Sequence, residues 1–187
     1  MFKHIGVVGA GLMGSEIALV FALAGRRVKL NDSDPKLLDE SVNRLERVLQ
    51  KGIDRELYAA DAIQVVLPRI QLCTTLKDYS DCDLVVEAVY EDERVKSNVF
   101  KELDRIVSDE CIIASNTSSI SITTLASQVS EVRRARFIGT HFFSPVSKMR
   151  LVEVIPGLDT DGSIIEEVMS ECRDIGKTPI EVKDVVG

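Results

Sequence analysis

Near its amino terminus the chain reads Ile5-Gly6-Val7-Val8-Gly9-Ala10-Gly11-Leu12-Met13-Gly14, and this stretch decides the fold. A short apolar run of strand type leads into a G-x-G-x-x-G pattern, which alone is a weak signal with many false positives. The context strengthens it, because a helical stretch follows and Asp32 stands 18 residues after Gly14 at the end of the next apolar run. This order of strand, glycine turn, helix and acidic strand end predicts a dinucleotide-binding unit.

The glycines of the pattern have different physical tasks in such a unit. Gly9 allows the tight turn, Gly11 lets the backbone approach a pyrophosphate, and Gly14 lets the helix pack against the strand. Free N–H groups and the positive end of the helix dipole then attract the phosphates without a basic side chain. Asp32 can accept hydrogen bonds from both ribose hydroxyls and would repel a 2′-phosphate, which predicts NAD rather than NADP. The alternative is a glycine turn that serves packing alone.

The composition bounds the class of protein. The chain has 187 residues, of which 45% are hydrophobic and 28% charged, as in an ordinary globular domain with a packed core. The net charge of -7 and the scattered Lys and Arg residues argue against a nucleic-acid partner. The longest apolar run, Ile17 to Ala24, is too short to span a membrane, and the amino terminus lacks the features of a secretory signal. We therefore expect a cytoplasmic protein without a membrane segment.

The spacing of the four cysteines bears on redox chemistry and on metal binding. None of the four cysteines forms a C-x-x-C motif, so we expect reduced thiols that pack in the core and no metal site. They are Cys73, Cys82, Cys111 and Cys172.

Short apolar runs alternate with longer stretches of helical periodicity along the whole chain, which is typical of parallel βαβ units. We expect strands at Ile5–Val8, Arg27–Asn31, Ile70–Cys73, Leu84–Val89, Ile112–Ser115, Phe137–Phe142, Leu151–Ile155 and Pro179–Val182. We expect helices at Met13–Ala24, Pro35–Lys51, Arg94–Val107 and Ser163–Ile175, the last stopped by Gly176. No repeat, linker or low-complexity tract divides the chain, so residues 1–187 are predicted to form one α/β domain of Rossmann type, with a doubly wound, mostly parallel sheet.

One histidine and one carboxylate are candidates for acid–base chemistry. His4 begins the first strand and would lie at the sheet edge opposite a ligand, whereas His141 lies near the carboxyl end of its strand, where ligands bind. Glu153 interrupts the apolar strand Leu151–Ile155, and because a buried carboxylate is costly unless paired, we expect it to be buried against His141. It would fix the imidazole tautomer and stabilise the protonated ring. The pair is predicted to be a general base with its orienting partner; the alternative is a structural ion pair.

A polar cluster follows the strand Ile112–Ser115. The sequence Ser115-Asn116-Thr117-Ser118-Ser119 would lie at the carboxyl end of this strand, at the same edge of the sheet as His141. Its hydroxyls would be placed to position a substrate oxygen. An N-cap and turn for the following helix explains the cluster equally well, so both interpretations stay open.

Six motifs, taken in order, resemble the N-terminal domain of the L-3-hydroxyacyl-CoA dehydrogenases, the family that includes 3-hydroxybutyryl-CoA dehydrogenase. They are Gly9-Ala10-Gly11-Leu12-Met13-Gly14, Val85-Val86-Glu87-Ala88-Val89, Ser115-Asn116-Thr117-Ser118-Ser119, His141-Phe142-Phe143-Ser144-Pro145-Val146, Leu151-Val152-Glu153-Val154-Ile155 and Gly176-Lys177-Thr178-Pro179. The resemblance spans essentially the whole chain. It implies oxidation of an (S)-3-hydroxyacyl-CoA to the 3-oxoacyl-CoA with NAD, in fatty-acid or related acyl-CoA oxidation.

The same resemblance implies roles for individual residues. His141 would be the catalytic base, Glu153 its partner, and Ser118 a contact to the substrate oxygen beside the nicotinamide. The cofactor contacts would come from Gly9, Gly11, Leu12, Met13, Gly14, Asp32, Glu91, Lys96, Ser118 and Ser144. The chain departs from the commoner family pattern at Ser144, where that pattern has Asn; Ser keeps a hydrogen-bond donor but has a shorter reach.

The family pattern continues beyond Gly187 into a helical domain that supplies an active-site Asn and the dimer surface. The chain stops at Lys183-Asp184-Val185-Val186-Gly187 without a terminal helix. We therefore expect the helical domain to be absent, the full-length protein to be a homodimer, and this chain to bind NAD but turn over poorly alone. Lys51 and Arg55 are the candidates for contacts with the adenine end of CoA.

Two other functions remain open on sequence grounds. One is a related NAD-dependent dehydrogenase that acts on a free β-hydroxyacid or a polyol rather than on a thioester. The other is a non-catalytic NAD-binding protein. The combination of His141, Glu153 and Ser118 in one chain argues against the second of these.

Overall fold

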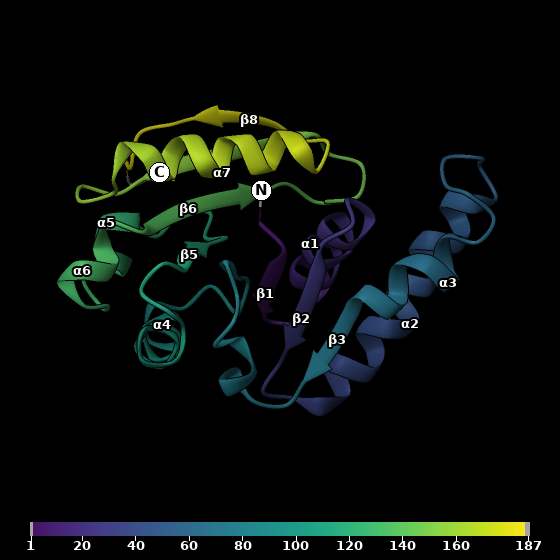
Figure 1. Ribbon diagram of the computed structural model, residues 1–187, viewed down its shortest axis with the longest axis horizontal. Helices are drawn as coiled ribbons and strands as arrows, with labels where there is room; N and C mark the ends of the chain where they lie inside the picture. The colour runs from purple at the N-terminus through teal and green to yellow at the C-terminus, as the bar shows by residue number, and fades with distance from the viewer. Residues whose placement is uncertain (1, 186–187) are drawn as a thin grey trace.

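A single sheet of eight strands organises residues 2–185, the part of the chain that the computed structural model describes (Figure 1). The order of the strands across the sheet is β3-β2-β1-β4-β5-β6-β7-β8. Their bounds are His4–Val8 for β1, Arg27–Asn31 for β2, Ile70–Cys73 for β3, Leu84–Glu87 for β4, Ile112–Ser115 for β5, Phe137–Phe142 for β6, Leu151–Pro156 for β7 and Thr178–Glu181 for β8. Every neighbouring pair is parallel except β6 and β7. The predicted mostly parallel α/β sheet is confirmed.

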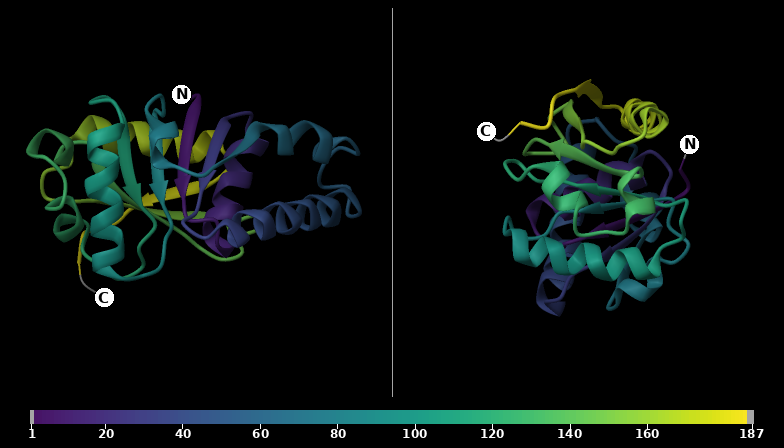
Figure 2. Two further views of the ribbon diagram at one scale, coloured as in Figure 1. Left: turned by 90° about the horizontal axis from the view of Figure 1, so that it is seen from below. Right: turned by 90° about the vertical axis from the view of Figure 1, so that its left-hand side faces the viewer.

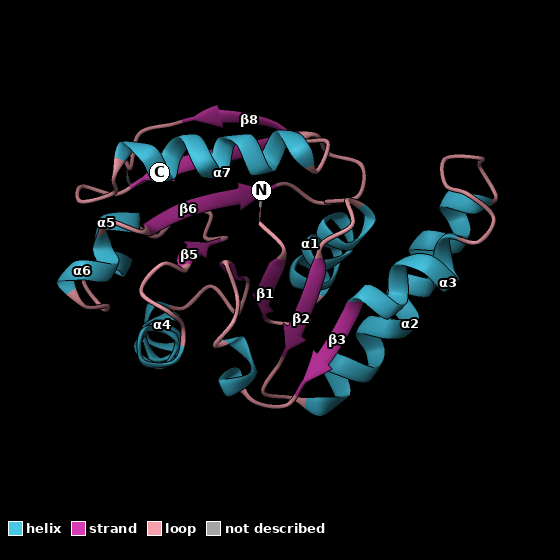
Figure 3. Ribbon diagram, in the orientation of Figure 1, coloured by secondary structure: helices cyan, strands magenta, loops and turns pink. Residues whose placement is uncertain are grey.

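Helices cover both faces of this sheet (Figures 1 and 3). The long helices are α1 (Leu12–Leu23), α2 (Pro35–Ile53), α4 (Glu93–Ile106) and α7 (Gly162–Asp174). Apolar residues of α1 and α7 belong to one buried cluster, and those of α4 belong to a second cluster on the other face. This double covering is the reason why the inner strands are apolar on both sides, as parallel strands require.

An arm projects from one edge of the sheet, beyond β3 (Figures 1 and 2). It is formed by α2 and the short helix α3 (Ala62–Val66). The α2 helix begins as the sequence predicts, because the Asp34 side chain accepts a hydrogen bond from Lys36 N at 3.0 Å and Pro35 occupies the first turn. Leu38, Leu45 and Leu49 form its buried stripe.

Several predicted boundaries move by one or two residues, and two differences have clear physical causes. The β4 strand ends at Glu87 rather than Val89, because Val89 N donates to the Glu87 carboxylate at 2.8 Å instead of to a neighbouring strand. The short helices α3, α5 (Ile122–Ala126) and α6 (Glu131–Arg134) were not predicted. Helices of one turn are too short to show a helical period in the sequence.

Other expectations can be compared directly with the structure. Gly176 follows α7 with φ of +79°, the left-handed conformation that its predicted place after the helix requires. All four cysteines are buried as free thiols, as predicted. Within residues 2–185 no helix has both the length and the apolar character needed to cross a membrane. Of the predicted abrupt end of the chain, Val186 and Gly187 lie outside the described residues.

The topology brings the candidate site together. Because β1, β4, β5 and β6 are parallel neighbours, their carboxyl ends meet at one edge of the sheet. The glycine turn, the end of β4, the Ser115–Ser119 cluster and His141 follow or end these strands. His4, at the amino end of β1, lies at the opposite edge, as predicted.

Candidate active site

The glycine turn joins β1 to α1, and each glycine meets a different constraint. Gly9 has φ of +103°, a backbone conformation that other residues rarely adopt. A Cβ atom on Gly14 would lie 1.8 Å from the Gly9 carbonyl oxygen, so only glycine lets α1 begin so close to the turn. A Cβ atom on Gly11 would meet nothing within 4 Å, so the backbone there borders open space. The turn at Gly9 and the close approach at Gly14 agree with the predicted tasks, and the pyrophosphate contact at Gly11 stays a prediction.

The open space beside Gly11 is a cavity of about 800 Å³ at the carboxyl ends of β1, β2 and β4. It is lined by Val8, Gly9, Gly11, Leu12, Met13, Asn31, Asp32, Ser33, Asp34, Pro35, Leu37, Leu38, Thr74, Thr75, Leu76, Ala88, Val89, Tyr90, Val95, Val99 and Glu102. Gly11 is the N-cap of α1 and gives the first turn no side-chain hydrogen bond, which leaves N–H groups for an anion.

The Asp32 carboxylate is held in a fixed orientation at the wall of this cavity. Its Oδ2 accepts a hydrogen bond from Ala10 N at 2.7 Å, and its Oδ1 accepts one from Asp34 N at 2.9 Å. Each carboxylate oxygen can accept further bonds, so ribose hydroxyls have acceptors here. A mostly apolar cavity with a carboxylate and a helix N-terminus at one wall fits NAD.

The candidate general base and its partner lie on β6 and β7. His141 and Glu153 are directly opposite each other in the antiparallel ladder, and His141 Nδ1 lies 2.8 Å from Glu153 Oε2. The predicted pairing is therefore present. It occupies Nδ1, so Nε2 is the nitrogen that remains for a substrate proton. The His141 ring also contacts Phe143, with 4.5 Å between ring centroids.

The premise that Glu153 is buried is wrong, although the pairing inferred from it is present. The Glu153 side chain is 30% exposed and that of His141 19% exposed. The physical reason is the strand's alternation: Val152 and Val154 point into the core and are fully buried, whereas Glu153 lies on the other, half-exposed face. The pair thus keeps contact with solvent.

Glu91 binds the Ser115–Ser119 cluster after β5 through several hydrogen bonds. Glu91 Oε1 accepts hydrogen bonds from Thr117 Oγ1 at 2.5 Å, Ser118 N at 3.0 Å and Ser119 Oγ at 3.2 Å. Partial burial raises the pKa of Glu91, but the Thr117 hydroxyl and the Lys96 ammonium outweigh it and lower that pKa to about 2. The carboxylate therefore stays charged and fixes the backbone that carries Ser118.

Both interpretations of this cluster find some support in the contacts. Thr117 Oγ1 accepts from Ile120 N at 3.0 Å, which makes a local turn. The cap of the following helix α5, however, is Ser121 rather than a member of the cluster, since its side chain accepts from Thr124 N. Asn116 Oδ1 accepts from Phe142 N at 2.8 Å and so ties the cluster to the strand of His141. Ser118 itself is exposed, and its hydroxyl lies 3.5 Å from Glu91 Oε1.

Lys96 lies behind Glu91 in a buried network rather than on the wall of the large cavity. Its side chain is 1% exposed, and its ammonium lies 2.7 Å from Glu87 Oε1 and 3.1 Å from Glu91 Oε2. The other oxygen of the fully buried Glu87 accepts from Ser115 Oγ at 2.6 Å. Sequence reasoning assigned no role to Glu87. The signal that could have identified Glu87 is its position: it is a carboxylate directly after the apolar run Leu84–Val86, at the same sheet edge as the glycine turn.

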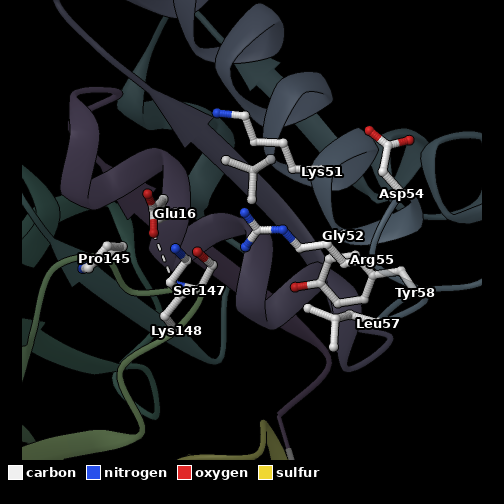
Figure 4. A pocket seen from close by; sticks show the side chains of 11 residues that line it. Glu16, Lys51, Gly52, Asp54, Arg55, Leu57, Tyr58, Pro145, Ser147 and Lys148 are labelled. Carbon is white, nitrogen blue, oxygen red and sulfur yellow. Dashed lines mark hydrogen bonds between the residues drawn. The ribbon is translucent and has the colours of Figure 1, made fainter.

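A second cavity, of about 470 Å³, lies between the α2 arm and the loop that joins β6 to β7 (Figure 4). The arm contributes Lys51 and Arg55, the two candidates for CoA contacts, and the loop contributes Pro145, Ser147 and Lys148. Figure 4 shows the Arg55 guanidinium reaching from the arm toward Glu16 and Ser147. Ser144 precedes this wall and is exposed.

Sheet topology, glycine turn and cavity together define a Rossmann-type dinucleotide-binding domain. Comparison with known proteins narrows this class. The profile of the family described as "3-hydroxyacyl-CoA dehydrogenase, NAD binding domain" matches residues 4–185. The chain belongs to this family, and its cofactor is NAD.

Individual relatives agree with that assignment. A "Probable 3-hydroxybutyryl-CoA dehydrogenase" of Deinococcus radiodurans is 44% identical over 182 residues, which are 97% of this chain and 64% of that protein. The "Fatty acid oxidation complex subunit alpha" of Idiomarina loihiensis is 38% identical over 99% of this chain and 26% of that protein. The crystal structure of (S)-3-hydroxybutyryl-CoA dehydrogenase from Ralstonia eutropha has a TM-score of 0.95 and 38% identity, over 99% of this chain and 65% of that one. The chain thus spans less than two thirds of each of these relatives.

Proposed function

We propose that the protein carrying this chain oxidises an (S)-3-hydroxyacyl-CoA to the 3-oxoacyl-CoA with NAD, and that residues 1–187 are its NAD-binding domain. The observation that carries the proposal is the His141–Glu153 pair, at 2.8 Å, on the same sheet edge as the glycine turn. A cofactor that accepts hydride and a group that accepts a proton are the two requirements for oxidising an alcohol. Membership in the family supports the substrate class.

In the proposed reaction the substrate hydroxyl donates its proton to His141 Nε2 while the C–H bond of the same carbon breaks. Bound NAD supplies the acceptor for that hydride. Glu153 accepts the hydrogen bond from His141 Nδ1–H, fixes the tautomer and stabilises the imidazolium that forms. The carbon–oxygen bond becomes a carbonyl, so one hydride and one proton leave the alcohol together.

The remaining site residues divide into two groups in this proposal. Ser118 contacts the substrate oxygen, and Glu91 holds the Ser118 backbone in place. The residues that hold NAD lie at the glycine turn and after the ends of β2, β4, β5 and β6: Gly9, Gly11, Leu12, Met13, Gly14, Asp32, Glu91, Lys96, Ser118 and Ser144. In this set Lys96 acts through Glu91, because its ammonium is buried between two carboxylates.

The substrate's CoA group needs an anion site, and the second cavity offers one. Lys51 and Arg55 line it, and it adjoins the β6–β7 loop that follows His141. We place the CoA phosphates near these two cations. We also propose a homodimeric full-length protein in the cytoplasm, where its four free thiols stay reduced.

A substrate series on the full-length protein tests the proposed function. The series compares (S)-3-hydroxyacyl-CoA thioesters, their (R) enantiomers and free 3-hydroxy acids, with NADH formation as the measurement. We expect turnover only with the (S) thioesters. His141→Gln should lower kcat by roughly 10²- to 10⁴-fold, the usual contribution of a positioned general base. His4→Gln, the matched control at the opposite sheet edge, should leave it unchanged. Wild-type turnover by His141→Gln, or a preference for the free acids, would overturn the proposal.

A further inference from the structure

The motif Gly176-Lys177-Thr178-Pro179 has no part in the mechanism above, yet its lysine is buried. Lys177 follows α7 and is 8% exposed. Its ammonium donates to the carbonyl oxygen of Val146 and, at 2.9 Å, to that of Met149. A buried ammonium without hydrogen-bond acceptors costs several kcal/mol, on the order given for buried ions in proteins. Both acceptors belong to the loop that joins β6 to β7.

A second buried charge binds the same loop from a different helix. Glu16 lies in α1, between apolar residues, and is 5% exposed. Its Oε2 accepts a hydrogen bond from Ser147 N at 2.9 Å, drawn as the dashed line in Figure 4. Burial holds the pKa of Lys177 below its usual value, and the Glu16 carboxylate offsets part of this effect.

The three contacts fall within four consecutive residues, Val146 to Met149. The Glu16 carboxylate on α1 accepts from the N–H group of Ser147. The Lys177 ammonium after α7 donates to the carbonyl groups of Val146 and Met149. Val146 is buried by this arrangement, while Ser147 and Lys148 form the wall of the second cavity. The same loop connects His141 on β6 to Glu153 on β7 and carries Ser144.

We propose that Lys177 and Glu16 form a buried clamp, defined as these two side chains, which positions the β6–β7 loop as the wall of the acyl-CoA cavity. Both are positioning residues that act through the loop backbone. The identity of the ligand rests on the proposed function; the clamp itself does not. Its effect falls mainly on thioester binding, since the cavity beside the glycine turn is lined by other segments and the proposed cofactor contact Ser144 precedes the residues that the clamp holds.

A buried cation elsewhere in the fold provides a matched control. Arg133, in the short helix α6 that precedes β6, is 3% exposed and donates to the carbonyl oxygens of Cys111 at 2.6 Å and Asp109 at 3.2 Å. It resembles Lys177 as a buried cation that binds backbone carbonyls, and it also binds the Asp104 carboxylate at 3.2 Å. It lies at the amino ends of β5 and β6, the sheet edge opposite the site.

The test uses Lys177→Met, Glu16→Gln and Arg133→Met in the full-length protein. Hydrogen exchange of the segment 142–150 is measured first, then KM and kcat for the acyl-CoA and the Kd for NADH. Lys177→Met should remove the exchange protection of the Ser147 amide and raise KM by about tenfold, which is the loss expected for a charge-assisted hydrogen bond. kcat and the NADH Kd should change by less than about threefold. Glu16→Gln keeps an oxygen for Ser147 and should give a smaller shift of the same kind.

Two results would overturn the clamp. One is unchanged exchange in the segment 142–150 for Lys177→Met. The other is a rise in KM, a fall in kcat and a loss of NADH affinity by similar factors in Lys177→Met, with the same result in Arg133→Met. That pattern would indicate a general loss of stability. If no acyl-CoA is turned over by the wild type, the proposed function fails, and the exchange and NADH measurements still decide on the clamp.

Discussion

Two halves of the sheet would serve the proposed reaction by different means. In the half formed by β1, β2 and β4, the backbone forms much of the cavity proposed for NAD: three glycines and a helix N-terminus shape it, and one carboxylate, Asp32, lines it. In the half formed by β6 and β7, side chains act, and the antiparallel ladder places His141 opposite Glu153. Substitutions should therefore act through shape in the first half and through charge in the second.

The largest expected effect comes from a methyl group in the first half. Gly14→Ala places a Cβ atom 1.8 Å from the Gly9 carbonyl oxygen, so α1 must move away from β1. We expect a loss of about 3 kcal/mol or more in the free energy of unfolding, and loss of NADH binding, by chemical denaturation and NADH fluorescence. Gly11→Ala is the control, because its Cβ atom meets no protein atom. It should weaken NADH binding while Tm stays within about 2 °C. Equal destabilisation by both would contradict this account.

A smaller effect is expected from removing one charge in the second half. Glu153→Gln keeps the size of the side chain but leaves the His141 imidazolium without its carboxylate. A hydrogen bond to a charged group contributes about 1.5 to 3 kcal/mol, so kcat should fall by about 10- to 100-fold. The NADH Kd should stay at its wild-type value. A change in NADH affinity with normal kcat would mean that the two halves are not separate in their tasks.

The smallest effect is expected at Glu91, which lies between the two halves and whose carboxylate binds the Ser118 backbone. Because its pKa is lowered from 4.5 to about 2, the unfolded chain binds the proton first, and stability rises with pH across this interval. The contribution is thus complete above about 4.5 and is lost as the pH falls through about 2. Glu91→Gln should lower Tm slightly at neutral pH, and the difference from wild type should shrink in acid.

Thermal unfolding at a series of pH values measures this prediction. Glu93→Gln, an exposed carboxylate two residues away, is the charge-matched control. A Tm difference between wild type and Glu91→Gln that stays constant down to the acid limit would show that the charge of Glu91 does not stabilise the fold.

The first half was predictable from sequence because backbone constraints are local. Gly9, Gly11 and Gly14 meet their constraints within a single turn, and Asp32 follows the next strand. The second half was predictable for a related reason: His141 and Glu153 are 12 residues apart on neighbouring strands. The error about the burial of Glu153 arose because its flanking residues, Leu151 and Ile155, are themselves only partly buried. An apolar neighbour on the same face does not prove that the face is covered.

What the sequence did not reveal are contacts between distant segments. Glu16 and Ser147 are 131 residues apart, and Lys177 lies 31 residues from Val146. Glu87 meets Ser115 across two adjacent strands. A buried charge in an apolar helix, such as Glu16, signals that a partner exists but not which one. The partner follows only from the packing of α1 against the β6–β7 loop.

The reversed strand β7 separates two properties that are coupled in a purely parallel sheet: the position of the paired side chains and the length of the connection between their strands. Ladder hydrogen bonds from Ile138 to Phe142 fix the register, and with it the distance from His141 to Glu153, independently of the connection between the strands. That connection can therefore gain or lose residues between Phe143 and Arg150 without disturbing the proton-accepting pair. Substrate range and acid–base geometry can evolve separately on this hairpin, and an engineer can exchange the one while keeping the other.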